Sequence, residues 1–345
     1  MLIASRYEPT GNASWGGMSE VHECLDKHLD RKVMLKRVKK SADAGRLLDE
    51  QKALLALRAK HVVELLDIVE YDYNGEIEKG LILEHISGTD LDEGRFSLDL
   101  NYLKILWQVA SGLTDIHAAG VIHRDIKPNN LRLDDNGVIK IIDFGLSRQS
   151  GVDDKTRSIA GTRGYMAPEL FGNKTIGFSN AIDVFAFGKT AISLLVAQQD
   201  QIGASFGDIC KSVLGQADSE FRSAIERCCS IDPNGRPTMS ELRDMLSARI
   251  LFNQHRANIF EGSKVTQVNS ANPKISITTT IGKLSLLYNG YHISVDDVTG
   301  NISINNKALT KGDRITSSGV IIFRHGDGTF AGCLPYDLSN PQVAI

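Results

Sequence analysis

The sequence has few cysteines and no long run of apolar residues. Its five cysteines are odd in number and include no Cys-x-x-Cys pair. This usage argues against a disulfide framework or a zinc site, and it favours reduced thiols in a cytosolic protein. The longest apolar run, near 191–197, is far below the ~20 residues that a membrane-spanning helix needs. Residues 1–10 lack the basic and apolar regions of a secretion signal. We therefore expect a cytoplasmic protein with no membrane partner.

Neither sign of charge dominates the chain. The formal net charge is −3 and the pI is near 6.3. No overall field draws the protein to nucleic acid, so no nucleic-acid partner is expected. The 345 residues are 42% apolar and 23% charged, an ordinary globular composition whose length predicts two or three domains.

The residue pattern changes twice along the chain. Residues 6–85 mix short β-branched runs with one helical pattern, and residues 98–250 have mainly helical periodicity. Residues 273–334 are rich in Ile, Thr, Ser and Val, with turn signals such as Asn289-Gly290 between short runs. The prediction is an α+β unit followed by a small all-β domain. Its boundaries are 1–250 for the first domain, 251–272 for a polar linker and 273–345 for the all-β domain.

One ordered set of polar residues carries most of the chemical information. The run His123-Arg124-Asp125-Ile126-Lys127-Pro128-Asn129-Asn130-Leu131 is followed by Asp143-Phe144-Gly145. Phosphoryl transfer needs a group that orients a hydroxyl nucleophile, oxygen ligands for the metal ions on the phosphates, and a cation for the developing charge. The set supplies all three. A surface turn with scattered charges is a very improbable explanation for every member of the set.

With these motifs, residues 6–250 resemble the eukaryotic-like (Hanks-type) protein Ser/Thr kinases, the bacterial or phage branch most of all. The resemblance implies a bilobal protein-kinase fold, with an N-lobe over about 6–85 and a C-lobe over about 86–250. It implies that Asp125 accepts the proton of the substrate hydroxyl and that Lys127 stabilises the transferring phosphoryl group. It also implies that Asn130 and Asp143 ligate Mg²⁺ (or Mn²⁺), which suits their oxygen ligands.

The resemblance further implies an ATP site. Ser14 to Val21 is similar to the glycine-rich loop over the phosphates, although serines replace two of the family's glycines. Lys36 matches the lysine that binds the α- and β-phosphates, and Glu50 matches its helical partner, which a buried ammonium needs. Backbone groups of a hinge near Glu84 would read the adenine edge. The residues assigned to ATP are Ser14, Gly16, Gly17, Val21, Met34, Lys36, Glu50, Glu84, Ile86 and Arg132.

Two of these positions depart from the family. Met34 stands where an alanine is usual above the adenine, and Arg132 stands where an aliphatic residue is usual below it. One hypothesis is that Met34 and Arg132 sandwich the adenine, because a guanidinium and a thioether both pack on aromatic rings. The alternative is that Arg132 turns to solvent or to an acidic neighbour. Weakened ATP binding is a third reading.

The segment from Asp143 to Glu169 resembles an activation segment. Thr156 and Ser158 are candidate phosphosites, and an ordinary loop role for each is about as expected. Arg124, beside Asp125, would bind such a phosphate through two hydrogen bonds. Thr162 is expected to bond Asp125 and Lys127.

Three further residues have implied structural roles. Glu169 should pair with Arg236, and Asp183 should bond the backbone of the His123-Arg124 turn.

The all-β segment faintly resembles the later strands of forkhead-associated (FHA) domains, which bind phosphothreonine peptides. Asn289-x-x-His292 would stand in the place of the Ser-x-x-His of that family, without its serine. Docking, regulation or dimer contacts are the plainer expectation, and a phosphopeptide partner is the alternative.

The prediction for the whole chain is an ATP-dependent protein Ser/Thr kinase that phosphorylates its own activation segment. Self-association for phosphorylation in trans and protein substrates with Ser or Thr hydroxyls would follow. Two alternatives stay open: a weak or silent kinase-fold scaffold acting through its β domain, and a kinase of small molecules or nucleic acid.

Overall fold

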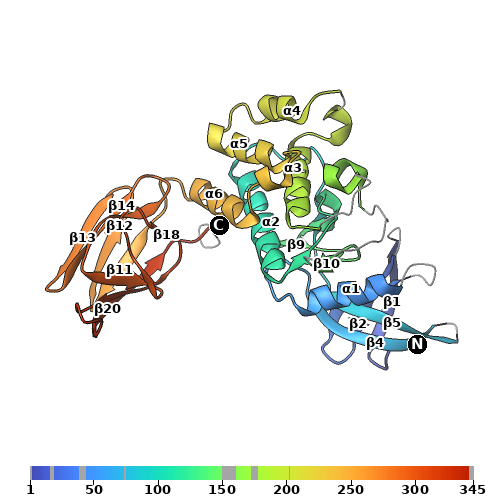
Figure 1. The fold of residues 1–345 in the computed structure, drawn as a ribbon. Coiled ribbons are helices and arrows are strands. Elements are labelled where there is room, and N and C mark those ends of the chain that lie inside the picture. The colour runs from blue at the N-terminus through green and yellow to red at the C-terminus, as the bar shows by residue number, and fades with distance from the viewer. Residues whose placement is uncertain are drawn as a thin grey trace. The chain divides into compact units, whose positions relative to one another are not determined.

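The structure is a computed structural model. It describes residues 2–15, 19–38, 44–73, 75–149, 161–171, 178–201 and 203–341. Two compact units divide the chain, residues 1–243 and residues 244–345 (Figure 1). The first unit combines a β-rich N-lobe with a helical C-lobe, and all-β strands follow it along the chain. The predicted bilobal fold with a small all-β domain is therefore confirmed.

The N-lobe is built on a five-stranded antiparallel sheet in the order β1-β2-β3-β5-β4. Alternation along β3 (Arg31–Val38) buries Val33 and Leu35 on one face and directs Met34 and Lys36 to the other. Register aligns Lys36 with Val21 on one side and with Leu81 on the other. The remaining elements of this lobe are β1 (Tyr7–Trp15), β2 (Ser19–Asp26), α1 (Ala44–Leu55), β4 (Leu65–Tyr73) and β5 (Glu76–Glu84).

Helices dominate the C-lobe. Side chains of Asp99, Ser205 and Asp218 cap α2, α4 and α5 by accepting hydrogen bonds from backbone N–H groups in the first turn. Helix α3 is apolar on nearly every face and lies in the core, as its sequence predicts. The helices are α2 (Leu100–Ala118), α3 (Ala181–Leu195), α4 (Phe206–Val213), α5 (Ser219–Cys228) and α6 (Met239–Ile250), the last of which crosses the boundary between the units.

Short strands and 3-10 turns hold the polar motifs between these helices. Strands β6 (Thr89–Asp90), β8 (Leu131–Leu133) and β9 (Ile139–Ile141) form a three-stranded sheet, and β7 (Val121–Ile122) pairs with β10 (Arg148–Gln149). The 3-10 turns are η1 (Pro128–Asn130), η2 (Arg163–Tyr165), η3 (Pro168–Phe171), η4 (Gln198–Gln201) and η5 (Pro233–Gly235).

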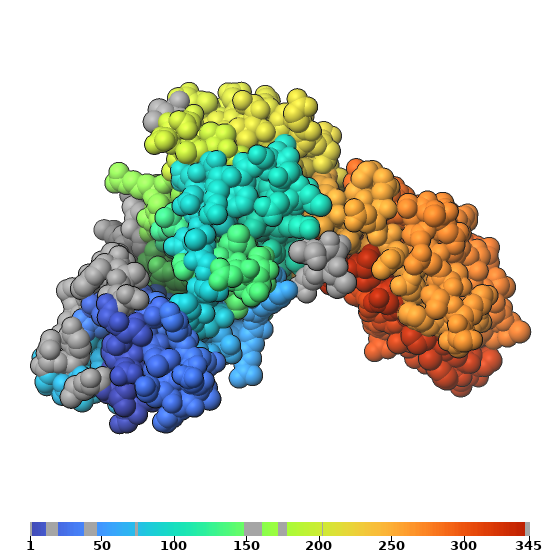
Figure 2. Space-filling view, turned by 180° about the vertical axis from the view of Figure 1, so that it is seen from behind, coloured from blue at the N-terminus to red at the C-terminus, as the bar shows by residue number. Residues whose placement is uncertain are grey.

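The C-terminal unit, which is coloured orange to red in Figure 2, contains two antiparallel sheets. One sheet has the order β12-β11-β20-β19-β16-β17 and the other β13-β14-β15-β18. Their inward residues share one apolar core that includes Leu284, Val295, Ile302 and Phe323. The strands are β11 (Ala257–Glu261), β12 (Lys264–Val268), β13 (Lys274–Thr279), β14 (Gly282–Tyr288), β15 (Ile293–Thr299), β16 (Asn301–Ile304), β17 (Lys307–Ala308), β18 (Arg314–Ile315), β19 (Gly319–Arg324) and β20 (Phe330–Leu338).

One expectation about this region differs from the structure, and one is confirmed. The span 251–272, expected to be a linker, contains β11 and β12, because Ala257, Ile259 and Val268 point into the core while residues between them face outward. Asn289 is a turn residue: its Oδ1 accepts the N–H groups of Tyr291 and His292 in the β14–β15 connection. Asn289 is therefore occupied in shaping its own turn.

Among the described residues, no helix combines the length and the apolar character that crossing a bilayer requires.

Candidate active site

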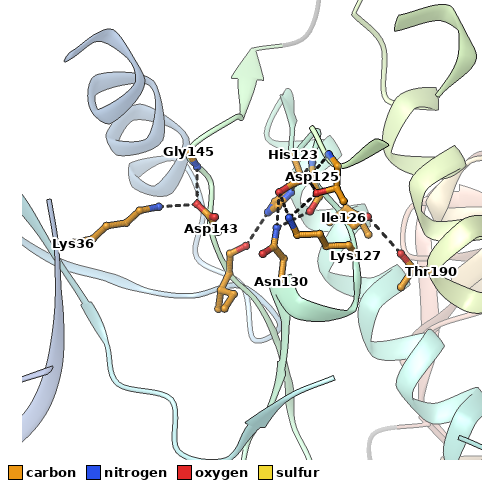
Figure 3. Close-up of polar contacts among 11 residues, drawn as sticks. Lys36, His123, Asp125, Ile126, Lys127, Asn130, Asp143, Gly145 and Thr190 are labelled. Carbon is orange, nitrogen blue, oxygen red and sulfur yellow. Dashed lines mark hydrogen bonds and ion pairs between the residues drawn. The ribbon is translucent and has the colours of Figure 1, made fainter. Parts of the chain in front are cut away.

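Lys36 lies at the centre of a buried ion-pair cluster. Its Nζ is 2.7 Å from Glu50 Oε1 on α1 and 2.8 Å from Asp143 Oδ1 (Figure 3 shows the second contact). Burial alone lowers the pKa of Lys36, but the two carboxylates outweigh burial and hold that pKa above its ordinary value. The ammonium is therefore charged at neutral pH, as binding to phosphate oxygens requires.

Asp143 is held in an unusual backbone conformation. Its φ is +63°, a region that non-glycine residues rarely adopt. Gly145 donates its N–H to Asp143 Oδ1, and the N–H of the buried Phe144 donates to Glu50 Oε1 at 3.2 Å. Burial raises the pKa of Asp143, yet Lys36 overcomes that effect and the pKa falls to about 2. Because its side chain is 49% exposed, this carboxylate faces outward as an anion.

Asp125 is fixed by donors on three sides. Its Oδ2 accepts from Lys127 Nζ at 2.8 Å and from Asn130 Nδ2 at 2.9 Å. Its Oδ1 accepts from Thr162 Oγ1 at 3.0 Å and from the Thr162 N–H at 3.2 Å. Lys127 Nζ also donates to Thr162 Oγ1 at 2.7 Å. The predicted grouping of Asp125, Lys127 and Thr162 is present, and one carboxylate is held in a single orientation.

The orientation of Asn130 fits a metal ligand. Its Nδ2 donates to the backbone carbonyl and to the carboxylate of Asp125, which leaves the amide oxygen for other partners (Figure 3). Among the described residues, no group of three or more His, Cys, Asp and Glu side chains could hold a metal ion. Mg²⁺ commonly takes only one or two protein oxygens and completes its shell with water and phosphate. Asn130 and Asp143 match that sparse donor set.

Asp183 supports the loop that carries Asp125. The two oxygens of its carboxylate accept the N–H groups of His123 and Arg124, both at 2.8 Å. His117 Nε2 lies 2.9 Å from the same carboxylate. Burial raises the pKa of Asp183, but the hydrogen bond from His117 and the nearby histidines lower it overall. The backbone bonds hold Arg124 at φ +71°, so Asp183 stabilises a strained turn.

Glu169 and Arg236 form a two-point ion pair deeper in the C-lobe. Arg236 Nη1 and Nη2 donate to the two Glu169 oxygens at 2.7 and 2.8 Å. The guanidinium also donates to the carbonyls of Ser230 and Ala181, and its side chain is fully buried. The predicted pair is present and ties η3 to η5.

The sequence that forms this site matches a known protein family. A family model described as "Protein kinase domain" matches residues 11–246, which is more than half of the chain. The chain belongs to the protein kinase domain family. Members of this family generally use ATP and Mg²⁺ and act on proteins.

Curated relatives of this kinase domain come from distant organisms. A probable serine/threonine-protein kinase, pknA2 of Bifidobacterium longum, is 30% identical over 57% of this chain and 27% of its own length. Mitogen-activated protein kinase 16 of Oryza sativa subsp. japonica is 28% identical over 69% of this chain and 58% of its own. PknA of Corynebacterium glutamicum is 29% identical over 65% and 50%. The chain thus spans between about a quarter and somewhat over half of these relatives.

The contacts of Arg132 differ from the stacking hypothesis. Its Nη1 donates to Asp90 at 2.7 Å, and Nε and Nη2 donate to the carbonyls of Ile86 and Gly88, each at 2.8 Å. The guanidinium therefore has the acidic neighbour of the alternative reading, and the expected sandwich with Met34 is corrected. Charge pairing and three hydrogen bonds outweigh a stacking contact here.

Several assigned residues cannot be placed. Gly16, Gly17, Thr156 and Ser158 lie outside the described residues. The backbone of Ser14 belongs to β1, and Val21 lies on β2 opposite Lys36.

The sequence reading missed two partners in this domain. No role was expected for His117, which contacts Asp183, or for Lys140, which binds Glu84. Helical spacing gave no signal for His117, because its partner Asp183 is 66 residues away.

Proposed function

We propose that the N-terminal unit is an ATP- and Mg²⁺-dependent (or Mn²⁺-dependent) protein Ser/Thr kinase. The observation that carries the proposal is the fixed orientation of Asp125, held by Lys127, Asn130 and Thr162. A carboxylate that orients a hydroxyl nucleophile is the central protein group in this chemistry, which depends on positioning and electrostatics. Family membership and kinases among the relatives support the same assignment.

The proposed mechanism assigns one role to each group. The hydroxyl oxygen of a substrate Ser or Thr attacks the γ-phosphorus, its proton passes to Asp125, and the bond from phosphorus to the ADP oxygen breaks. Lys127, 2.8 Å from Asp125, stabilises the charge on the transferring group. Lys36 binds the α- and β-phosphates while Glu50 keeps it in place. Asn130 and Asp143 would hold Mg²⁺, which neutralises phosphate charge when bound.

The base side of the proposed nucleotide site involves the same sheet. Met34 shares a face of β3 with Lys36, and the segment from Glu84 to Ile86 begins at the last residue of β5. Val21 and Ser14 belong to the strands that flank the glycine-rich loop, for which Gly16 and Gly17 are proposed as phosphate-covering residues. Arg132 contributes through Ile86, as developed below.

Regulation through the activation segment is part of the proposal. Thr156 and Ser158 are proposed phosphosites, modified in trans when two copies associate transiently. The Arg124 guanidinium lies 4.3 Å from the Phe178 ring and donates to the Leu146 carbonyl, so it is near this segment. A phosphate dianion would give Arg124 a stronger partner than either contact.

The proposed partners are proteins with accessible Ser or Thr hydroxyls in the cytoplasm. We propose docking or regulation as the main role of the C-terminal β unit, with FHA-like phosphothreonine binding as its alternative. Titration of the full chain with phosphothreonine peptides and their unphosphorylated forms would separate the two. No difference between the two peptide sets at high concentration would end the FHA-like proposal.

Labelled ATP tests the kinase assignment directly. Wild-type protein should label itself and dephosphorylated casein, and Asp125→Asn should lower the rate about a thousandfold, within the range for losing a positioned base. Asp135→Asn, an exposed aspartate in the β8–β9 turn, is the matched control and should keep full activity. Equal rates for wild type and Asp125→Asn, or no transfer by wild type, would favour a silent scaffold.

A further inference from the structure

A row of four charged side chains crosses the small sheet beside the site. Antiparallel register aligns Asp90 on β6 with Arg132 on β8, and Arg132 with Lys140 on β9. Glu84, at the end of β5, extends the row because Lys140 Nζ lies 2.7 Å from its Oε1. The signs along the row run negative, positive, positive, negative.

The two central cations would repel each other if they had no partners. Like charges directly opposite in a sheet are destabilising. Each cation is instead paired with an acid on the opposite side, Arg132 with Asp90 and Lys140 with Glu84. Both acids belong to the connection 84–90, which links β5 of the N-lobe to the C-lobe. The two ion pairs therefore hold this connection at both of its ends.

Hydrogen bonds to the backbone of the connection add to these ion pairs. Arg132 donates to the carbonyls of Ile86 and Gly88 in the middle of the connection. Gly88 has φ +102°, and a Cβ added there would lie 2.1 Å from the carbonyl oxygen of Leu133 on β8. The fixed fork of a guanidinium can span several acceptors at once, which a lysine ammonium on a flexible stem does less well. The connection thus lies directly against β8.

The hairpin that holds the connection also carries the proposed metal ligands. Strand β8 begins directly after Asn130, and β9 ends two residues before Asp143. The N–H of Ile142 donates to the carbonyl of Asn130 at 3.0 Å, which closes the hairpin at that end. One rigid element therefore sets both the metal ligands and the connection 84–90.

We propose that Arg132 and Lys140 are positioning residues for the nucleotide. They fix the connection 84–90 relative to Asn130 and Asp143, and so set the distance between the place of the base and the place of the phosphates. The inference rests on the proposed ATP-dependent activity and adds residues that act on the base end of the ligand only. Effects on the base end can be separated from effects on the phosphate end with a ligand that has no base.

The test compares full-chain variants with two ligands, MgATP and magnesium tripolyphosphate. Arg132→Leu should weaken MgATP binding about tenfold, the scale of losing charged hydrogen bonds that are partly exposed to water, and leave tripolyphosphate affinity unchanged. KM for ATP should rise by a similar factor while kcat at saturating ATP stays within about twofold. Lys140→Met should have a smaller effect of the same kind, about threefold. Arg132→Lys should recover part of the loss.

Amide hydrogen exchange gives a readout that does not depend on activity. Residues 86–90 should exchange faster in Arg132→Leu than in wild type, while α2 and α3 stay unchanged. Lys79→Met is the matched control, because Lys79 pairs with Glu70 across β4 and β5, away from the connection. It should change neither ligand affinity nor exchange at 86–90.

Two results would overturn the inference while leaving the kinase assignment intact. One is an Arg132→Leu variant that binds MgATP as wild type does. The other is equal weakening of MgATP and tripolyphosphate, which would indicate general damage to the site. Failure of the wild type itself to bind MgATP would reject the proposed function, and the positioning role with it.

Discussion

The two units of the chain use polar groups in opposite ways. The N-terminal unit buries ionised or strongly polar side chains deep among apolar ones, including Lys36, Glu50, Asp183 and Arg236. Among the described residues of the C-terminal unit, the buried polar side chains are His255, Ser285 and Ser303. The first unit therefore buries several charged side chains, whereas the described Asp, Glu, Lys and Arg side chains of the second unit are at least partly exposed.

This difference indicates where chemistry takes place. Burying a charge costs desolvation free energy that its partner often does no more than offset, so a buried ion pair is a poor way to stabilise a fold. The buried pair of Lys36 and Glu50 lies at the proposed phosphoryl-transfer site, where low dielectric strengthens the interaction. The described residues of the β unit form a plain apolar core between two sheets.

The sharpest test of this contrast replaces one lysine in each unit. Lys36→Met should lower phosphoryl transfer about a thousandfold, because it removes the buried cation proposed to bind phosphate. Lys274→Met removes an ion pair of similar length, 2.6 Å to Asp296, but its side chain is 60% exposed. This second variant should keep full activity in the labelled-ATP assay. Similar losses in both variants would contradict the contrast.

Shortening a core side chain of the β unit should destabilise that unit and leave the stability of the first unit unchanged. Leu284 is fully buried between the two sheets of the β unit, and Leu284→Ala should destabilise that unit by about 3 kcal/mol. Hydrogen exchange of residues 257–338 would report the loss. Both tryptophans, Trp15 and Trp107, lie in the first unit, so fluorescence-detected urea unfolding of that unit should be unchanged. A shifted fluorescence transition would show that the units unfold together.

The pair of Glu169 and Arg236 should have a smaller effect. Glu169→Gln leaves the buried Arg236 guanidinium with carbonyl partners but without its counter-charge. Since the Glu169 side chain is 21% exposed, water screens part of the loss, and about 2 kcal/mol is expected in the fluorescence transition. Glu220→Gln, an exposed glutamate at the start of α5, is the control and should change stability little. Equal midpoints for the two variants would argue against a stabilising pair.

The most gradual expected effect is a pH dependence of the β unit, because it develops over the whole range between two pKa values. Burial, and then the nearby His292, lower the pKa of His255 to about 4. The unfolded chain has an ordinary histidine pKa near ~6.5, so it binds more protons than the folded state between these values. The free energy of unfolding should therefore rise from pH 4 to pH 6.5, by at most about 1.4 kcal/mol per pH unit, and then level off.

Hydrogen exchange of residues 257–338 at several pH values measures this slope. His255→Gln should remove its contribution while leaving that of every other titrating group. A slope that is the same in wild type and His255→Gln would show that His255 does not titrate as described.

The motifs of the first unit could be read from the sequence because their spacing is local. Asp125, Lys127 and Asn130 lie within six residues, and a short hairpin brings Asp143 back beside them. The side-chain direction of Arg132 was not readable in the same way. It depends on Asp90, 42 residues earlier, and on carbonyls of a connection whose path the sequence pattern does not fix. The first strands of the β unit, β11 and β12, were missed because the apolar residues Phe260 and Val265 are exposed, so polar and apolar residues do not alternate cleanly along these strands.

Sequence alone determined the chemical inventory of this protein: two ordered acids, an amide and two ammonium groups at spacings typical of one family, followed by a region of β-branched runs. Periodicity and turn residues, which are local properties, were enough for the fold class. Only the tertiary structure showed the pairs of Lys36 with Asp143 and of Arg132 with Asp90, because they form between segments far apart in the chain. Pairing of that kind depends on burial and on distance in space, neither of which a linear pattern contains.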